Sequence, residues 1–349
     1  MDRRSFLATG LSLPFATAAR SQTAAPFYLA DMHFHSFFGQ STYHSRPVGK
    51  TFSDGGATLV AWKIVGDIRW IQSTDRGYKQ KGEPVPGEAM ASFKVVAGLV
   101  KAHAAEQKLK FALTPGDVDL ALKGDPHIVL AVEGATFVEN VAHVQVAYDL
   151  GLRHLQLVHY IRNPLGDFQT EKPEHNGLTE LGRQVILECN RLGILVDLAH
   201  CTPEAIKAAL AISKAPMVWS HSSIASPGTK PNFSMLGWRA RQLTVEDAKA
   251  IAAKGGVIGL WAIKQDVGET VDAYGKRLLE MAAIVGDNHV GFGTDINGLG
   301  PFAMIFNYVD VRKVVEGWQK QNVSEARIRK MAIENYARVL KAALVPVKA

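Results

Sequence analysis

The chain has 349 residues, of which 47% are hydrophobic and 21% are charged, and its formal net charge is +6. This composition is typical of a soluble globular protein with an ample core. The positive charge is dispersed, with no run of Lys and Arg and no aromatic residues interleaved with basic ones, which argues against a nucleic-acid-binding protein.

The first 25 residues resemble an export signal. Residues 2–7, DRRSFL, resemble the twin-arginine motif, and a weakly apolar stretch follows, with small residues suited to cleavage near Ala18 or Ala25. That stretch is too short to span a bilayer, and no later segment approaches the required length. We therefore expect a periplasmic mature protein, residues 26–349, without an integral membrane segment. The alternative is a cytosolic protein with a basic N-terminus.

Short apolar runs bounded by turn or polar residues predict eight buried strands. Segments with a helical period separate most of them, and this alternation favours parallel pairing with the helices outside. Since no internal repeat or interdomain linker is visible, we predict one α/β domain, a (β/α)8 TIM-type barrel. The predicted strands are 27–32, 57–63, 127–132, 154–158, 194–198, 216–220, 256–261 and 290–293.

The clearest predicted helix runs from Leu178 to Leu192 and is opened by Thr179. The segment 64–126 is ambiguous, and its Gly/Pro-rich centre, Lys79 to Gly87, is interpreted as a loop between helices. Further helices are predicted over Pro203–Ile212, Val245–Lys254, Val271–Val285, 308–321 and 324–343.

The only cysteines are Cys189, on a predicted helix, and Cys201, at a strand end. No CxxC or Cys-His metal pattern is present. We predict core or loop thiols, and leave a disulfide between the two as the alternative.

Potential metal ligands stand where the predicted strands end. His33 and His35 follow the first strand, and in an extended chain side chains at i and i+2 point to the same side, so both imidazoles can meet one cation. Two core or surface histidines are the alternative. Asp31, in the same register, is a candidate to orient a ring or the strand end.

Four more strand ends carry ionisable residues. Glu133 follows a buried run and needs a partner there, which is supplied either by a bridging position between two cations or by a salt bridge. His200 and His221 end successive strands and are candidate ligands, with packed core histidines as the alternative. Asp295 ends the eighth strand and is a candidate general base, or else a loop cap.

Two further residues are candidates for contact with a substrate. His159 ends the fourth strand and is a candidate ligand or a donor to a developing oxyanion, with a core histidine as the alternative. Arg241 follows a loop rich in Pro, Gly and Ser, and is a candidate bidentate clamp for a substrate carboxylate. A surface arginine is the other interpretation.

These motifs, in this order, resemble the membrane (renal) dipeptidase family of zinc metallopeptidases. The resemblance covers nearly all of the chain after residue 25. Its strongest stretches are GLTELG from Gly177, NRLGILVDLAH ending at His200, WSHSS around His221, RQLT from Arg241, KGGVIG from Lys254 and VGFGTD ending at Asp295.

The resemblance implies a (β/α)8 barrel with two zinc ions, bridged by Glu133 and by a water or hydroxide that attacks a dipeptide bond. It implies that His33 and His35 hold the first zinc, and that His200 and His221 hold the second. It also implies that Asp295 takes the proton of the bridging water and that His159 contacts the carbonyl or oxyanion of the substrate. Arg241 would bind the substrate's C-terminal carboxylate.

One position departs from the family pattern. The first metal motif of the family is usually HxD, whereas this chain has His35 in the second position. A neutral imidazole in place of a carboxylate makes the centre one charge unit more positive, so we expect a lower pKa of the bridging water and a stronger preference for zinc over harder cations. Ile296-Asn297, where the family tends to have Phe-Asp, bears on the substrate pocket instead.

The favoured hypothesis is an exported dinuclear zinc dipeptidase whose partner is a small dipeptide-like substrate. A related metal-dependent amidohydrolase for N-acyl amino acids, β-lactams, lactones or esters is the nearest alternative. A non-catalytic periplasmic binding protein is the second. The sequence leaves open the preferred side chains and the oligomeric state, with a homodimer as one option.

Overall fold

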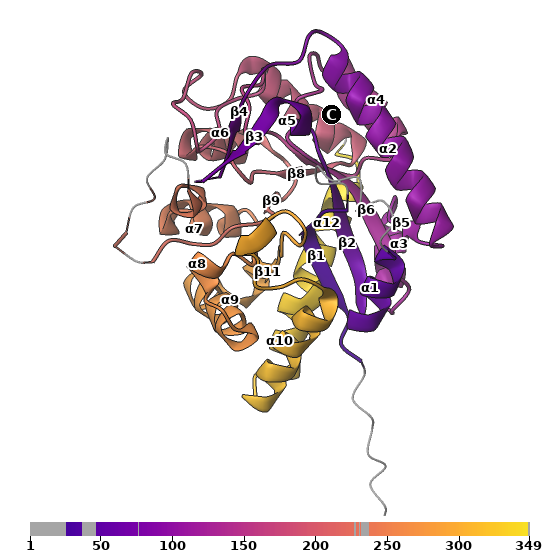
Figure 1. Cartoon of the computed structure of the whole chain (residues 1–349), viewed down its shortest axis with the longest axis vertical. Helices are drawn as coiled ribbons and strands as arrows, with labels where there is room; N and C mark the ends of the chain where they lie inside the picture. Colours follow the sequence, from indigo (N-terminus) through magenta and orange to yellow (C-terminus); the bar gives the residue numbers. More distant parts are fainter. Residues whose placement is uncertain are drawn as a thin grey trace, which may run out of the picture.

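The computed structural model describes residues 26–36, 47–75, 77–226, 228, 229, 231 and 237–347. In this part of the chain, eight parallel strands pair in the order β1-β2-β6-β7-β8-β9-β10-β11. A parallel bridge from Phe34 to Ile296 brings the end of the last strand back to the first. Helices surround these strands, so the predicted (β/α)8 barrel is confirmed (Figure 1). The predicted export signal, residues 1–25, lies outside the described residues.

Each of the eight predicted strands is present, with ends shifted by a few residues. The strands are short and buried, as expected for a barrel covered by helices on the outside and filled by side chains on the inside. Their bounds are β1 Leu29–Phe34, β2 Ala57–Val65, β6 His127–Glu133, β7 His154–Gln156, β8 Leu195–Asp197, β9 Val218–Trp219, β10 Val257–Leu260 and β11 Val290–Phe292.

The predicted helices are also found, and their starts follow ordinary capping chemistry. The Thr202 side chain accepts a hydrogen bond from the Ala205 backbone N–H, with Pro203 at the first helical position. The helices are α1 Val48–Gly55, α2 Glu88–Glu106, α3 Pro115–Ala121, α4 Ala142–Asp149, α5 Glu180–Leu192, α6 Pro203–Ile212, α7 Val245–Ala253, α8 Lys264–Val267, α9 Val271–Val285, α10 Tyr308–Lys320, α11 Glu325–Arg329 and α12 Asn335–Leu344, with a π-helical turn, Lys330–Glu334, before α12.

The ambiguous segment contains strands that the sequence did not predict. β3 (Ile71–Thr74) and β4 (Gly77–Gln80) form an antiparallel hairpin, and β5 (Lys110–Phe111) pairs with β6. The interpretation of Lys79–Gly87 as a loop between helices is therefore wrong at its start, because its first two residues end β4. Both hairpin strands are mostly polar and half-exposed, so they lack the apolar alternation that indicates a strand.

Two further expectations concern the core and the membrane. Cys189 and Cys201 are both buried and free, which confirms core thiols, and burial raises the pKa of each. No helix in the described part of the chain is both long and apolar enough to cross a membrane.

A buried charged pair joins two strands inside the barrel. Lys63 Nζ on β2 donates to Asp197 Oδ2 on β8 at 2.7 Å, and His154 Nε2 lies 3.1 Å from the same oxygen. Burial alone would raise the pKa of Asp197, but Lys63 and His154 hold it well below its usual range. Burial and the neighbouring Lys63 lower the pKa of His154 to about 4, so this histidine is neutral at pH 7.

The other oxygen of Asp197 fixes two strand ends. Its Oδ1 accepts from the backbone N–H of Ala199 at 2.9 Å and of Ser220 at 3.0 Å. These two residues directly precede His200 and His221. The buried Asp197 carboxylate thus fixes the backbone position of the two residues that precede the candidate ligands His200 and His221.

Replacing Lys63 by Met leaves the Asp197 carboxylate buried without its cation. We expect the free energy of unfolding to fall by roughly 3–5 kcal/mol, the usual cost of breaking a buried pair from one side. The matched control is Lys50→Met, which removes an exposed pair with Asp54 at 2.8 Å and is expected to change stability by less than about 0.5 kcal/mol. Urea denaturation of both variants measures this, and equal small losses would contradict the expectation.

Candidate metal centre

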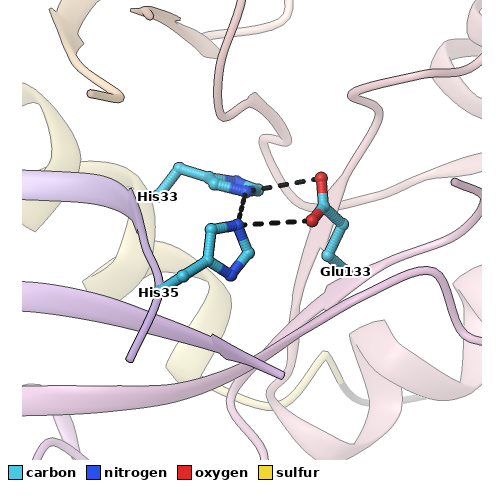
Figure 2. Close-up of side chains that lie close together, drawn as sticks. All are labelled: His33, His35 and Glu133. Atoms are coloured by element: carbon cyan, nitrogen blue, oxygen red, sulfur yellow. Dashed lines mark hydrogen bonds and ion pairs between the residues drawn. The ribbon is translucent and has the colours of Figure 1, made fainter. Parts of the chain in front are cut away.

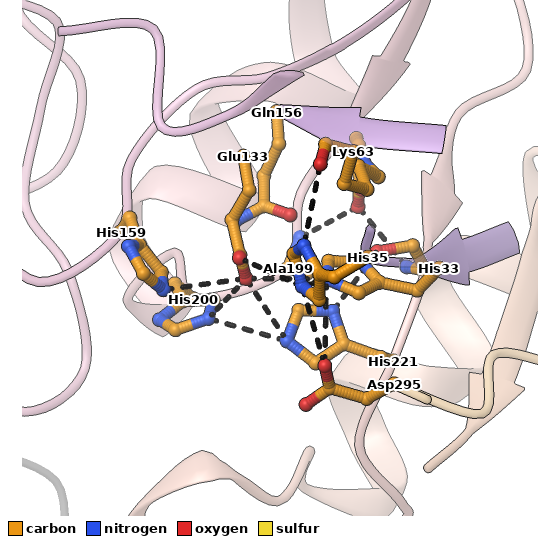
Figure 3. Close-up of polar contacts among 12 residues, drawn as sticks. His33, His35, Lys63, Glu133, Gln156, His159, Ala199, His200, His221 and Asp295 are labelled. Atoms are coloured by element: carbon orange, nitrogen blue, oxygen red, sulfur yellow. Dashed lines mark hydrogen bonds and ion pairs between the residues drawn. The ribbon is translucent and has the colours of Figure 1, made fainter. Parts of the chain in front are cut away.

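The carboxylate of Glu133, at the end of β6, lies at the middle of five imidazoles (Figure 3). Its Oε1 lies 3.3 or 3.4 Å from Nε2 of four of them, and its Oε2 lies 3.4 Å from Nε2 of the fifth. Burial alone would raise the pKa of Glu133, but the surrounding imidazoles outweigh this and hold it well below its usual range. The histidines are His33, His35, His159, His200 and His221.

The HxH pair has the geometry expected from its spacing (Figure 2). Nε2 of His33 and Nε2 of His35 lie 3.0 Å apart, and both face Glu133. The Nδ1 of His35 lies 3.3 Å from the Lys63 carbonyl oxygen, which only accepts hydrogen bonds. This contact favours the tautomer with the proton on Nδ1, in which the Nε2 lone pair is directed at the centre.

His200 and His221 approach Glu133 from the ends of β8 and β9. Their Nε2 atoms are 3.3 Å apart, and both rings are buried. Burial, together with nearby cationic groups, lowers the pKa of both well below the usual range, which keeps them neutral and able to bind a cation. His200 has a φ of 72°, a left-handed backbone that is strained for a residue with a side chain.

Asp295 completes the cluster from the end of β11. Its Oδ1 lies 3.3 Å from His35 Nε2, its backbone N–H donates to the His33 carbonyl at 2.9 Å, and its φ of 56° is again left-handed. Asp31 holds this end of the barrel, because its Oδ1 accepts from the backbone N–H of His33 at 3.0 Å and of Thr294 at 2.9 Å. Of the two orienting roles considered for Asp31, the contact with the strand end is the one observed.

His159 is held by a carboxylate that the sequence reasoning missed. Its Nδ1 lies 2.6 Å from Asp67 Oδ1, while its Nε2 faces Glu133. Burial alone would lower the pKa of His159, but Asp67 and Glu133 outweigh this and raise it. The ring can approach because Gly134, at a φ of 78°, lacks a Cβ that would lie 2.8 Å from the His159 Cβ.

Arg241 is buried beside the histidines and is only 2% exposed. Its Nη2 lies 3.4 Å from His221 Nε2, its Nε donates to Gln169 Oε1 at 3.1 Å, and its guanidinium lies 5.6 Å from the centre of the Trp261 ring. Its hydrogen-bond and ion-pair partners within the described chain include no carboxylate. A buried cation without a counter-charge is costly, so this position favours an anionic ligand.

A cavity of about 290 Å³ opens onto these groups. The unpredicted β3–β4 hairpin forms one part of its wall, and aromatic side chains form much of the rest. Its lining includes Glu133, His159, His200, His221, Arg241 and Asp295 from the centre, with Thr74, Tyr78, Tyr160, Trp238, Trp261 and Phe302 around them.

The donor set fits a metal centre. Two groups of three residues have ligand atoms that all lie within 4.8 Å of one another: His33, His35 and Glu133, and Glu133, His159 and His200. Imidazole nitrogens joined by one carboxylate suit zinc. The eight site residues predicted from the sequence thus lie together, each in contact with Glu133 or with a histidine beside it.

Similar folds are found among solved structures. A dipeptidase described as a metallopeptidase of family M19 aligns with a TM-score of 0.75 and 20% identity, over 91% of this chain and 99% of that chain. A metallopeptidase from Rhodobacter sphaeroides, bound to a phosphinate mimic of the dipeptide L-Ala-D-Ala, aligns with a TM-score of 0.71 and 19% identity, over 91% and 99%. At these identities the likeness establishes the fold.

Sequence comparisons find dipeptidases as well. Dipeptidase verJ of Clonostachys rogersoniana is 30% identical over 220 residues, which cover 61% of this chain and 54% of the relative. The chain spans about half the length of the curated relatives it matches. The family model for membrane dipeptidase, peptidase family M19, matches residues 86–346, about three quarters of the chain. The chain therefore belongs to the membrane dipeptidase family, peptidase family M19.

Proposed function

We propose that this protein is a zinc-dependent dipeptidase for dipeptides with a free C-terminal carboxylate. The observation that carries the proposal is the buried guanidinium of Arg241, which has no carboxylate partner among the described residues and lies next to the ring of His221. A substrate carboxylate bound there would place the adjacent peptide bond near Glu133 and the histidines. Membership of the family supports this choice.

The two metal ions would be held by two pairs of histidines that all face Glu133, His33 with His35 and His200 with His221. Two zinc ions bound there would supply a Lewis acid for the scissile carbonyl and an activated bridging water. Asp295 Oδ1, 3.3 Å from His35 Nε2, is placed to take and pass on a proton at this point. Its strained backbone, pinned to the His33 carbonyl, keeps the carboxylate directed at the centre.

The family resemblance assigns His159 to the substrate and His221 to the second metal ion, although the ligand atoms of His159 lie close to those of Glu133 and His200. The raised pKa of His159 separates it from His200 and His221, whose pKa values are lowered. Groups in one site whose pKa values are pushed apart commonly divide the acid and base roles. A protonated His159 would donate from Nε2 to the oxygen that becomes negative when the peptide bond is attacked.

The proposal also includes export and a small-molecule partner. The twin-arginine-type motif in residues 2–7 supports periplasmic location, because that route carries folded proteins and would deliver a metal-loaded enzyme. A dipeptide-like compound is the proposed substrate, and a homodimer remains one option for the assembly.

Metal analysis joined to a substrate panel tests the proposed function. We expect the purified protein to contain two zinc ions per chain, and to cleave L,L- or L,D-dipeptides faster than N-acyl amino acids, β-lactams, lactones or esters. Removal of zinc with a chelator should abolish turnover, and two equivalents of zinc should restore it. Zinc-free protein that binds dipeptides without turnover would contradict the proposal and favour the binding protein.

Arg241→Ala tests the carboxylate clamp. Hydrogen bonds to a charged group contribute roughly 1.5–3 kcal/mol, so we expect KM for a dipeptide to rise by about 10- to 100-fold. KM for the corresponding dipeptide amide should change far less. Arg239→Ala, which removes an exposed guanidinium two residues away, is the matched control and should leave both KM values unchanged. Equal rises of KM for the dipeptide and for its amide in Arg241→Ala would contradict the proposed binding of the substrate carboxylate by Arg241.

Asp67→Asn tests the role of His159, because it removes the charge beside Nδ1 with almost no change of shape. If His159 serves the substrate, kcat should fall by about 10- to 100-fold while the zinc content stays at the wild-type value. The control is Asp149→Asn, at an exposed position on α4. If Asp67→Asn instead loses one zinc equivalent while turnover per bound zinc stays normal, His159 is a metal ligand and the assignment to the substrate is wrong.

A further inference from the structure

Ser220 lies directly behind the metal centre and is fully buried. It follows β9 and precedes His221. Its Oγ lies 3.0 Å from Nδ1 of His221 and also 3.0 Å from Nδ1 of His33. One hydroxyl therefore contacts two candidate ligands that come from strands that are not neighbours in the sheet, β1 and β9.

The backbone of Ser220 is held on both sides. Its N–H donates to Asp197 Oδ1 at 3.0 Å. Its carbonyl oxygen lies against two glycines, where a Cβ on Gly259 would be 1.9 Å away and a Cβ on Gly293 would be 1.7 Å away. Both positions require glycine for this reason, and the barrel closes tightly around Ser220.

The two rings that Ser220 contacts are turned the same way. Nε2 of His33 and Nε2 of His221 each lie 3.4 Å from Glu133 Oε1, and the ring centres are 3.7 Å apart. Their Nε2 atoms thus face the centre, and their Nδ1 atoms face the hydroxyl. A histidine that binds a cation through Nε2 keeps its proton on Nδ1 and needs an acceptor for it.

We propose that Ser220 is a positioning residue shared by the two halves of the centre, accepting the Nδ1 protons of His33 and His221 at once. A hydroxyl oxygen has two lone pairs, so a single serine suffices for both rings. His33 belongs to the first ligand pair and His221 to the second, so this one oxygen fixes the ring tautomer of a ligand in each. The inference rests on the proposed zinc function.

The consequence is that both zinc affinities depend on Ser220. Loss of an acceptor behind a ligating histidine typically lowers metal affinity by about 10- to 100-fold. Since Ser220 serves a ligand of each pair, Ser220→Ala should weaken both equivalents together. An acceptor that served one ring alone would weaken one equivalent only.

Competitive zinc titration of the wild type, Ser220→Ala and Ser223→Ala tests this. Ser223 is also buried and bears a hydroxyl, but it bonds to Asp266 and not to a candidate ligand, so Ser223→Ala should bind both equivalents as the wild type does. We expect Ser220→Ala to bind both equivalents about 10- to 100-fold more weakly. Weakening of one equivalent, or of neither, overturns the inference and leaves the proposed function standing.

A measurement on the wild type covers the case in which Ser220→Ala does not fold. In the zinc-loaded protein, nitrogen-15 NMR of the imidazoles should show Nδ1 protonated and Nε2 metal-bound in both His33 and His221. A proton on Nε2 of either ring overturns the inference. Wild-type protein that binds no zinc overturns the proposed function itself, and the inference with it.

Discussion

The site is organised around one buried carboxylate. Glu133 is 2% exposed at the end of a strand whose other residues are buried as well, and an unpaired charge in that position would cost several kcal/mol. The barrel meets this demand by directing five imidazoles, from the ends of four strands, onto its two oxygens. Cations bound between the carboxylate and those rings would meet the same demand more fully. Charge balance at Glu133 is therefore the constraint that brings the five imidazoles together around its carboxylate.

The approach of the imidazoles to Glu133 does not by itself fix the positions of the rings. Two buried carboxylates below the site, Asp197 and Asp31, fix the backbone that carries them. Asp197 fixes the backbone before His200 and His221, and Asp31 fixes the ends of β1 and β11. Each acid accepts one hydrogen bond from an N–H at its own strand end and one from an N–H at another strand end. The strained φ angles of His200 and Asp295 persist because these bonds determine the backbone around them.

The sequence was most informative where a strand ended in an ionisable residue. The strand-end rule placed Glu133, His200, His221 and Asp295, and the i, i+2 rule placed the HxH pair, since both follow from local geometry. Asp67 also follows a buried strand, so the same rule applied there would have found it. The role of Lys63 could not be inferred, because its partner Asp197 is 134 residues away and a buried lysine has no local signature. The β3–β4 hairpin was missed because its strands are polar, and tertiary contacts decide such segments.

His35, where the family usually has an acid, is explained in part by its neighbours. Its Nε2 lies 3.4 Å from Glu133 Oε2 and 3.3 Å from Asp295 Oδ1. A third carboxylate here would face both acids at close range, and that arrangement is tolerable only while cations lie between them. An imidazole, with its Nδ1 3.3 Å from the Lys63 carbonyl oxygen, keeps a ligand atom at the same place without a third negative charge. His35 thus avoids a close approach of three carboxylates, and its Nε2 still offers a ligand atom beside Glu133.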